Sequence, residues 1–348
     1  MGQYVFRELD LTINKKMIKN FFKNKSLLIT GGTGSFGKAF VEYLLKEKVP
    51  LKKIIIFSRD ELKQFEMNKI FNEKIYKNIR YLIGDVRDKE RLKLAINSVD
   101  LVVHAAALKQ VPVAEYNPFE FIKTNVLGAQ NLIECCLGSS VSRVIALSTD
   151  KASSPINLYG ATKLCSDKIF IAANNIIGKQ NIKFAVVRYG NVMGSRGSVL
   201  DTFIEQSKNK LISITDKNMT RFNINMKEAI DLTIYSLINL KGGEIFVPKI
   251  PSFRIIDLAK AISNESKIKT IGIRPGEKVH EEMISSHDSS DVYDLGKYYT
   301  IIPNYLKNKY LSRKKIKKGF CYSSDNNPEF LSINQLKKII INYQKKAI

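Results

Sequence analysis

Short apolar runs alternate with longer amphipathic stretches along the first half of the chain. The runs are rich in Ile, Val and Leu, which is typical of buried parallel strands joined by crossover helices. They predict strands at Ser26–Thr30, Lys53–Phe57, Ile79–Ile83, Leu101–His104, Arg143–Ser148 and Lys183–Arg188. We therefore expect an α/β fold of the Rossmann type, a doubly wound parallel sheet with helices on both faces. Its ligand should lie beyond the carboxyl ends of the strands.

The pattern changes on either side of this region. Residues 1–24 lack sustained periodicity, so we expect an N-terminal extension that is mobile or loosely docked, with Met17 as an alternative start. Beyond residue 190 the alternation gives way to loops, shorter helices and strand fragments. The chain is therefore expected to form a dinucleotide-binding Rossmann domain over 25–190 and mainly a smaller C-terminal substrate-binding subdomain over 191–348.

A glycine-rich turn follows the first predicted strand. Gly31, Gly34 and Gly37 would let the backbone turn tightly and approach a pyrophosphate, and the helix that follows would offer free amides to the anion. The same turn nearly matches the GxxxxGK of a triphosphate loop, but Ala39 lacks the hydroxyl that magnesium needs there. A dinucleotide site is therefore favoured over a triphosphate site and over a plain glycine turn.

The end of the second predicted strand bears on which dinucleotide binds. An acidic residue there binds the ribose 2′-hydroxyl of NAD, whereas an Arg accommodates the 2′-phosphate of NADP. Ser58, Arg59 and Lys63 lie in this region and favour NADP. Asp60 is expected to cap the helix that begins here, which is compatible with the same residues binding the cofactor.

A Tyr and a Lys one helical turn apart, Tyr159 and Lys163, share a helix face. Oxidation of an alcohol needs a base, and a phenol with a pKa of about 10 is too protonated for that role. We expect the charge of Lys163 to favour the phenolate, and its ammonium to bind the nicotinamide ribose. Thr149, Asp150 and Lys151 end a strand beside this pair. A role for Asp150 and Lys151 as catalytic acid and base is therefore favoured over the alternative that they only cap the loop after the strand.

Composition limits the remaining classes of function. The net charge is +23, with Lys clusters near residues 15–25 and 307–318, which would suit nucleic acid, acidic lipid or phosphorylated small molecules. A solvated surface is the favoured interpretation, so we expect no nucleic-acid binding. No apolar run approaches the roughly 20 residues that a membrane-spanning helix needs, so we expect no membrane insertion either. The spacing of four cysteines and three histidines predicts no metal site and a reduced, cytoplasmic location.

The chain resembles the extended short-chain dehydrogenases/reductases, and closely the inverting UDP-N-acetylglucosamine 4,6-dehydratases among the polysaccharide biosynthesis proteins. The resemblance covers nearly everything from Leu27 to about Phe330. It rests on the ordered blocks Thr30–Gly37, Ser58–Lys63, Gly84–Asp88, His104–Lys109, Leu147–Lys151, Tyr159–Lys163, Arg188–Val192, Gly194–Val199 and Gly272–Lys278.

This resemblance implies NADP as cofactor and UDP-N-acetylglucosamine as substrate. Taken with the residues discussed above, the expected cofactor-binding residues are Gly31, Thr33, Gly34, Ser35, Phe36, Gly37, Ser58, Arg59, Asp60, Glu61, Leu62, Lys63, Asp85, Val86, Ala105, Lys109, Tyr159, Lys163 and Val192. Implied substrate contacts are Lys109, Leu147, Ser148, Asn191, Arg196, Gly197, Ser198, Val199, Arg221, Arg274 and Glu277. Arginines suit a UDP pyrophosphate because their hydrogen bonds to it are charge-assisted and bidentate.

The resemblance also implies a lyase mechanism. Tyr159 takes the C4 hydroxyl proton while hydride passes from C4 to NADP, and the resulting ketone acidifies the C5 hydrogen. Lys151 removes that proton if burial lowers its pKa toward neutrality, Asp150 protonates the departing C6 hydroxyl, and hydride returns to C6. Related retaining dehydratases carry Glu where Lys151 stands, so a Lys there indicates the inverting branch.

The resemblance further implies that the product feeds pseudaminic acid synthesis for flagellin or surface polysaccharide, and relatives suggest a dimer-based homo-oligomer, either a dimer or a hexamer. A sugar 4-epimerase of the same fold is the main alternative, but it has no use for an acid and base aimed at C5 and C6. A non-catalytic NADP-binding protein ranks lower, because the Tyr159 and Lys163 pair is intact. Tyr116 and Phe119, which could line a pocket, are expected in the core.

Overall fold

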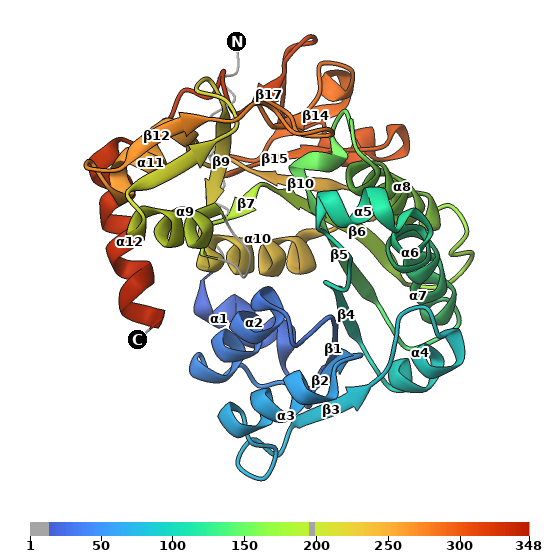
Figure 1. Cartoon of the computed structure of the whole chain (residues 1–348). Helices are drawn as coiled ribbons and strands as arrows, with labels where there is room; N and C mark the ends of the chain where they lie inside the picture. The colour runs from blue at the N-terminus through green and yellow to red at the C-terminus, as the bar shows by residue number, and fades with distance from the viewer. Residues whose placement is uncertain (1–13, 195–198, 348) are drawn as a thin grey trace.

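The computed structural model describes residues 14–194 and 199–347, and its centre is a ten-stranded sheet (Figure 1). The strand order is β16-β14-β15-β10-β6-β5-β4-β1-β2-β3. The strands are β1 Ser26–Thr30, β2 Lys53–Ser58, β3 Ile79–Ile83, β4 Leu101–His104, β5 Arg143–Thr149, β6 Lys183–Tyr189, β10 Ile245–Pro248, β14 Val292–Asp294, β15 Tyr298–Ile301 and β16 Lys314–Lys315.

The strands predicted from the apolar runs are confirmed, and β2, β5 and β6 each extend one residue further than expected. Neighbours from β3 through β6 pair in parallel, in the order 3-2-1-4-5-6 of a Rossmann sheet. The order reverses between β1 and β4, so a crevice forms beyond their carboxyl ends.

Helices cover both faces of the sheet, as Figure 1 shows. The helices α1, α2, α3 and α10 lie on one face, and α4, α7 and α8 lie on the other. The helices are α1 Lys15–Phe22, α2 Ser35–Lys46, α3 Glu61–Ile70, α4 Lys89–Ile96, α5 Val111–Tyr116, α6 Pro118–Phe121, α7 Gly128–Cys136, α8 Leu158–Ala173, α9 Val199–Lys208, α10 Met226–Asn239, α11 Ile255–Ile262 and α12 Ile333–Ala347, with the π-helix η1 Ile122–Leu127 and the 3₁₀ turns η2 Asp150–Ala152, η3 Asp288–Asp291 and η4 Asn304–Tyr310.

The C-terminal part of the chain contains short strands, as the sequence predicted, but its helices α10 and α12, of 14 and 15 residues, are among the longer helices described. It adds β10 in parallel to β6, and then β15, β14 and β16 in antiparallel fashion, to the central sheet. The smaller sheets contain β7 Asn191–Val192, β8 Leu211–Ile214, β9 Thr220–Ile224, β11 Ser252–Arg254, β12 Lys267–Thr270, β13 Glu282–Ile284 and β17 Tyr322–Ser323. The domain division near residue 190 stays a prediction, and the strands added to the central sheet cross it.

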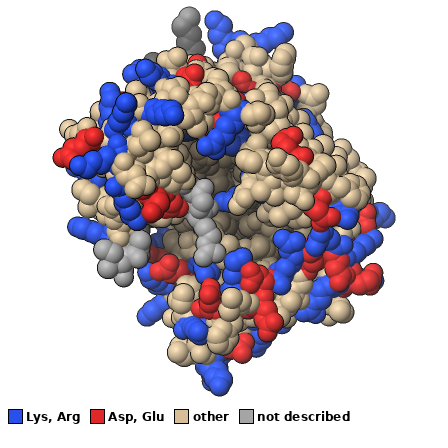
Figure 2. Space-filling model, in the orientation of Figure 1, with Lys and Arg blue, Asp and Glu red and all other residues tan. Residues whose placement is uncertain are grey.

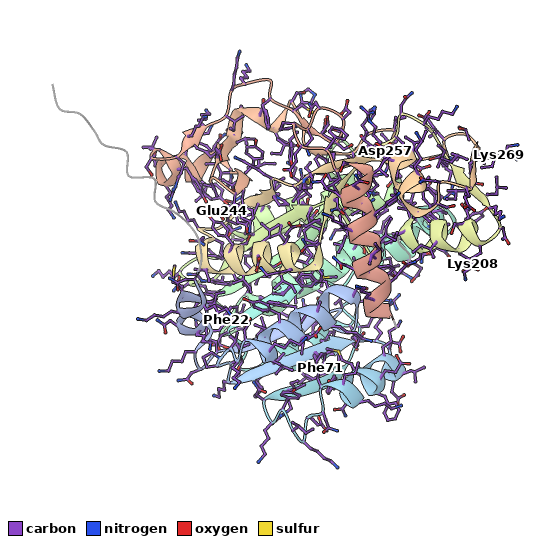
Figure 3. All side chains as sticks on the ribbon, turned by 90° about the vertical axis from the view of Figure 1, so that its left-hand side faces the viewer. Phe22, Phe71, Lys208, Glu244, Asp257 and Lys269 are labelled. Atoms are coloured by element: carbon purple, nitrogen blue, oxygen red, sulfur yellow. The ribbon has the colours of Figure 1, made fainter. Side chains whose placement is uncertain are left out.

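A second apolar core lies apart from the core of the central sheet. It is formed by α9, β8, α11 and α12, with Leu200, Phe203, Leu258 and Leu336 almost fully buried. In Figure 3 α12 extends down the side of the molecule from this region. This second core supports the segments that face the strand ends across the crevice.

The expectation of a mobile or loosely docked lead-in is wrong for the described part of residues 1–24. Asn14 caps α1 by accepting a hydrogen bond from the Met17 amide at 2.9 Å. Ile18 and Phe22, one turn apart, are buried in the main core, where α1 lies beside α10 (Figure 3). The helix has only eight residues, too few to show sustained periodicity in the sequence. Residues 1–13 lie outside the described part.

The core assignment of Tyr116 and Phe119 is also wrong. Tyr116 is 88% exposed and Phe119 is 57% exposed. They lie on the short helices α5 and α6, whose buried side chains are Ala114 and Phe121. An aromatic residue in a short helix carries no periodicity that separates its inner face from its outer face, so the sequence misplaced both.

Candidate active site

A cavity of about 1040 Å³ lies beyond the carboxyl ends of β1, β2, β4, β5 and β6. The face in Figure 2 is hollowed at its centre, and Lys and Arg side chains gather above and below the opening. The walls come from the glycine-rich turn, the ends of the strands, the start of α8, and Val199 and Leu200 of α9. The cavity is large enough for a dinucleotide and a small ligand together.

The glycine-rich turn forms the end of the cavity beside α2. Gly31 has φ +64°, and a Cβ there would lie 2.8 Å from the Cα of Ala106. A Cβ on Gly37 would lie 2.3 Å from the carbonyl oxygen of Gly32. The N-cap of α2 is Gly34, which has no side chain to accept hydrogen bonds from the first amides of the helix, and the first turn of α2 lines the cavity. These features fit a dinucleotide pyrophosphate.

Charged residues from the loops after β2 and β3 and from the first turn of α3 meet at the end of β2. Arg59 lies 3.5 Å from Asp85 in an ion pair, and both line the cavity. Asp60 accepts a hydrogen bond from the amide of Lys63, so the predicted cap of α3 is confirmed, and its other oxygen pairs with the Lys63 ammonium at 2.6 Å. The carboxylate of Asp60 is therefore engaged by α3 itself.

Tyr159 and Lys163 both line the cavity from the first turns of α8. Asn157 caps this helix by accepting a hydrogen bond from the Gly160 amide at 2.7 Å. A Cβ on Gly160 would lie 2.3 Å from the carbonyl oxygen of Lys151, so only glycine lets α8 approach η2 this closely. That close approach puts the Tyr159 and Lys163 pair beside Asp150 and Lys151.

The expected electrostatic effect of Lys163 on Tyr159 differs from what the structure shows. Burial raises the pKa of Tyr159 to about 12, and the opposing influences are the charge of Lys151 and a hydrogen bond with Thr149. The ammonium of Lys163 donates to the carbonyl oxygen of Leu147 at 2.8 Å, and burial lowers the pKa of Lys163. Lys151, rather than Lys163, is therefore the main charge that favours the phenolate here.

Asp150 and Lys151 form an ion pair at the wall of the cavity. The Lys151 Nζ lies 3.1 Å from Asp150 Oδ1, and Thr149 Oγ1 donates to the same carboxylate oxygen at 2.9 Å. Asp150 is fully buried beneath the cavity surface, whereas Lys151 lines it. Burial raises the pKa of Asp150, as a general acid requires.

The expectation that the pKa of Lys151 falls toward neutrality is wrong for this structure. Burial does act to lower the pKa of Lys151, but the nearby carboxylates of Asp150 and Glu281 outweigh it and raise the pKa. Glu281 Oε1 lies 3.0 Å from the Lys151 ammonium. The sequence did not reveal this second carboxylate, because nothing in the residues around Glu281 relates it to Lys151.

Most of the predicted site residues line one cavity. These are Gly31, Thr33, Gly34, Ser35, Phe36, Gly37, Ser58, Arg59, Asp60, Lys63, Asp85, Val86, Ala105, Lys109, Leu147, Ser148, Thr149, Lys151, Tyr159, Lys163, Asn191, Val192 and Val199. Arg196, Gly197 and Ser198 lie outside the described residues. The remaining predicted residues are described but do not line the cavity, namely Glu61, Leu62, Asp150, Arg221, Arg274 and Glu277.

The contacts of Arg221 explain why its side chain does not line the cavity. It is buried on β9, and its guanidinium donates to the carbonyl oxygens of Thr220, Lys278 and Val279. It also lies 3.5 Å from Glu277 and 3.7 Å from Glu281. Arg221 therefore holds the segment that precedes β13 against β9.

Three further observations concern metal-binding groups, cysteines and membrane-crossing helices. Within residues 14–194 and 199–347, no group of three or more His, Cys, Asp or Glu side chains is arranged to hold a metal ion. The four cysteines are free. Over the same described ranges, no helix is both long and apolar enough to cross a membrane.

Known proteins resemble this chain over nearly its whole length. It is 53% identical to the UDP-N-acetylglucosamine 4,6-dehydratase (inverting) of Campylobacter jejuni serotype O:23/36, with 92% of this chain and 98% of the relative covered. It is 43% identical to a UDP-glucose 4-epimerase of Rickettsia bellii, with 92% and 96% covered. The solved structure of Pen from Bacillus thuringiensis superposes with a TM-score of 0.86 at 39% identity and covers 93% of this chain and 99% of that one.

Residues 27–303 also match a family described as polysaccharide biosynthesis protein. The match includes the glycine-rich turn, the Asp150 and Lys151 pair, and the Tyr159 and Lys163 pair. All of these residues line one cavity except Asp150, which is buried beneath its surface. The chain therefore belongs to this polysaccharide biosynthesis protein family of extended short-chain dehydrogenases/reductases.

Proposed function

We propose that the protein is a lyase that removes water from UDP-N-acetylglucosamine, as a 4,6-dehydratase that inverts C5. The observation that carries the proposal is the Asp150 and Lys151 ion pair at 3.1 Å, next to Tyr159 at the cavity wall. An alcohol oxidation by itself uses one base, whereas elimination of water needs an additional acid and base. The relative from Campylobacter that carries this activity in its name supports the same conclusion.

In this proposal Tyr159 accepts the proton of the C4 hydroxyl. NADP, when bound, supplies the acceptor for the C4 hydride and returns the hydride to C6. The phenol of Tyr159 has a pKa raised to about 12, and the Lys151 charge and the Thr149 hydrogen bond both act to lower it. These two neighbours therefore assist the proton transfer from C4.

Lys151 and Asp150 act on the resulting 4-ketone. The ketone acidifies the C5 hydrogen. In the form of the pair in which the shared proton lies on Asp150, the neutral amine of Lys151 takes the C5 proton and Asp150 gives its proton to the C6 hydroxyl as it leaves. Asp150 suits the role of acid because burial raises its pKa. Inversion would follow from protonation of C5 on the opposite face, and its support is the resemblance to the inverting relatives.

A nicotinamide dinucleotide fits the glycine-rich turn, and we propose NADP over NAD. Arg59 lies at the end of β2, where a 2′-phosphate would sit. Asp60, the nearest carboxylate after β2, is already engaged by Lys63 and the first turn of α3. The end of β2 therefore offers the positive charge of Arg59 for a 2′-phosphate, rather than a carboxylate for the ribose 2′-hydroxyl.

For the substrate we propose Lys109, Leu147, Ser148, Asn191 and Val199 as contacts, since all of them line the cavity. The proposal extends to Arg196, Gly197, Ser198, Arg221, Arg274 and Glu277. Arg221 and Glu277 act through the segment that Arg221 holds against β9.

The test is to incubate the protein with UDP-N-acetylglucosamine and catalytic NADP in heavy water and to read the product by NMR. We expect a 6-deoxy-4-ketone with deuterium at C5 and the inverted configuration there. Asp150→Asn should abolish dehydration while bound sugar still reduces some NADP. Asp216→Asn, the same change in an exposed turn, is the matched control. Undiminished dehydration by the Asp150 variant would refute its role as acid.

A UDP-sugar 4-epimerase is the second candidate, because the rickettsial relative at 43% identity carries that name. Such an enzyme would return hydride to C4 and leave the C5 hydrogen in place. A UDP-sugar product of unchanged mass, with no deuterium at C5, would favour the epimerase and overturn the dehydratase.

We further propose that the protein works in the cytoplasm as a dimer-based homo-oligomer, either a dimer or a hexamer. The four free cysteines support a reducing compartment. We place its product on the route to pseudaminic acid for flagellin or surface polysaccharide, on the resemblance described above. Sedimentation of the purified protein tests the assembly, and a monomer would contradict it.

A further inference from the structure

Glu281 is a buried carboxylate at the catalytic pair to which no role has yet been assigned. It directly precedes β13, and its backbone is held on both sides by Ser324. The Glu281 amide donates to Ser324 Oγ at 2.9 Å, and the Ser324 amide donates to the Glu281 carbonyl oxygen at 2.7 Å. Glu281 and Ser324 are 2% and 0% exposed. The position of this side chain is therefore fixed by its own backbone.

The carboxylate of Glu281 points at Lys151. Its Oε1 lies 3.0 Å from the Lys151 ammonium and 3.7 Å from Nε of Arg221. Its Oε2 is buried and has no hydrogen-bond partner among the described residues. Burying an unpaired carboxylate costs free energy, and the positive charges of Lys151 and Arg221 balance the negative charge of Glu281. Their charges outweigh the effect of burial and hold the pKa of Glu281 below its usual value.

Lys151 is thereby held from two sides. Asp150 Oδ1 lies at 3.1 Å, Glu281 Oε1 at 3.0 Å, and the amide oxygen of Asn191 at 3.5 Å. The Lys151 side chain is only 21% exposed, and its backbone sits in the short turn η2 against β13. A lysine with its four-carbon stem would otherwise sample many rotamers at a cavity wall.

We propose that Glu281 is a positioning residue that holds the amine of Lys151 at the cavity wall and controls when that amine takes up a proton. This inference rests on the proposed dehydratase function. It adds a third ionisable group, supplied by the C-terminal part of the chain, to the Asp150 and Lys151 pair.

The proton balance of the elimination explains why a carboxylate next to Lys151 helps the reaction. The C5–H and C6–O bonds break and a C5–C6 double bond forms. Lys151 gains the C5 proton, and Asp150 loses a proton to the departing water. The pair therefore reacts from the form in which the proton of the ion pair lies on Asp150, a neutral amine beside a carboxylic acid, and it ends as an ammonium and a carboxylate. Glu281 stabilises the ammonium, so it favours proton transfer from C5 to Lys151.

Other charged and titratable groups face the same amine. Asp150 lies on η2, Tyr159 on α8, Arg221 on β9, and Lys278 on the segment before β13. Without the carboxylate of Glu281, the guanidinium of Arg221 would be left opposite the Lys151 ammonium. Both the orientation and the proton affinity of Lys151 should then change.

The experiment uses the full chain with NADP and UDP-N-acetylglucosamine, and compares wild type with Glu281→Gln. For each protein, C5 deuterium exchange is measured against pH and compared with reduction of the bound cofactor by substrate. The maximal exchange rate should fall roughly tenfold to hundredfold, the cost of misplacing a reacting group by about 1 Å. Cofactor reduction should change little. The rise of exchange with pH should move to lower pH, because the neutral amine of Lys151 then forms more readily.

Two variants separate this role from a purely structural one. Glu281→Asp keeps the charge but moves it away from the Lys151 ammonium, so it should slow exchange and move the pH profile in the same direction as Glu281→Gln, but less. Glu282→Gln changes the next carboxylate, which accepts from Ser153 and Ser154 instead, and should leave the pH profile unchanged. If Glu281→Gln does not fold, a Glu281→Asp variant that matches wild type in exchange rate and pH profile overturns the inference.

The outcomes distinguish this inference from the function on which it rests. Wild-type protein that exchanges no C5 hydrogen would refute the dehydratase, and this inference with it. Wild-type exchange together with a Glu281→Gln profile that matches wild type in rate and pH would overturn the role of Glu281 alone.

Discussion

The ion pair between Arg188 and Asp167 offers a sharp test of how the site is supported. Arg188 on β6 lies 3.2 Å from Asp167 on α8, and their side chains are 3% and 1% exposed. Ser148, at the end of β5, donates to the same Asp167 oxygen at 2.8 Å. The pair therefore fastens α8, which carries Tyr159, to two strands behind the cavity.

Asp167→Asn keeps the shape of the side chain and removes its charge. Breaking a buried pair leaves an uncompensated charge and costs about 3 kcal/mol or more. With an unfolding entropy of about 2.1 cal/mol/K per residue, the 348 residues contribute about 0.7 kcal/mol/K. The melting temperature should therefore fall by about 4 °C.

The assay is thermal unfolding followed by circular dichroism, since the chain contains no tryptophan. Glu42→Gln, which breaks an exposed pair with Lys46, is the control and should leave the melting temperature unchanged. The double variant Asp167→Leu with Arg188→Met should recover most of the loss, because an apolar replacement leaves no buried charge. A melting temperature of Asp167→Asn equal to that of the control would refute the reasoning.

Three further predictions concern the cavity. Gly37→Ala should weaken dinucleotide binding in calorimetry by at least about tenfold, because its Cβ would lie 2.3 Å from the Gly32 carbonyl oxygen, and unchanged binding would exclude this turn as the pyrophosphate site. Arg59→Ala should weaken NADP binding by about 10- to 100-fold and NAD binding little, and equal losses would contradict a 2′-phosphate contact. Thr149→Val removes a hydrogen bond that lowers the pKa of Tyr159. The rate of substrate-dependent cofactor reduction rises with pH, and this rise should shift to higher pH in the variant. An unmoved profile would show that Thr149 does not act on the phenol.

Much of the fold could be predicted from short stretches of sequence. A buried parallel strand needs several consecutive apolar residues, and β1 is buried along its whole length. Glycines in the turn after β1 are required by contacts within a few residues or with the adjacent strand. The spacing of Tyr159 and Lys163 places both on one helix face whatever the rest of the chain does.

Other features were decided by where distant segments meet. The eight residues of α1 are too few for a periodic signal, and only their burial against the main core shows that they dock. Tyr116 is aromatic but 88% exposed, because α5 turns another face inward.

Residues close together in the chain were therefore enough to predict the parallel sheet, the glycine-rich turn and the two neighbouring pairs, Tyr159 with Lys163 and Asp150 with Lys151. The electrostatic state of the site depends instead on how distant segments fold together. The tertiary structure brings Glu281 to 3.0 Å from Lys151 across the chain and raises the pKa of that lysine instead of lowering it. A pKa depends on burial and on every charge nearby, and the spacing of residues along the sequence predicts neither.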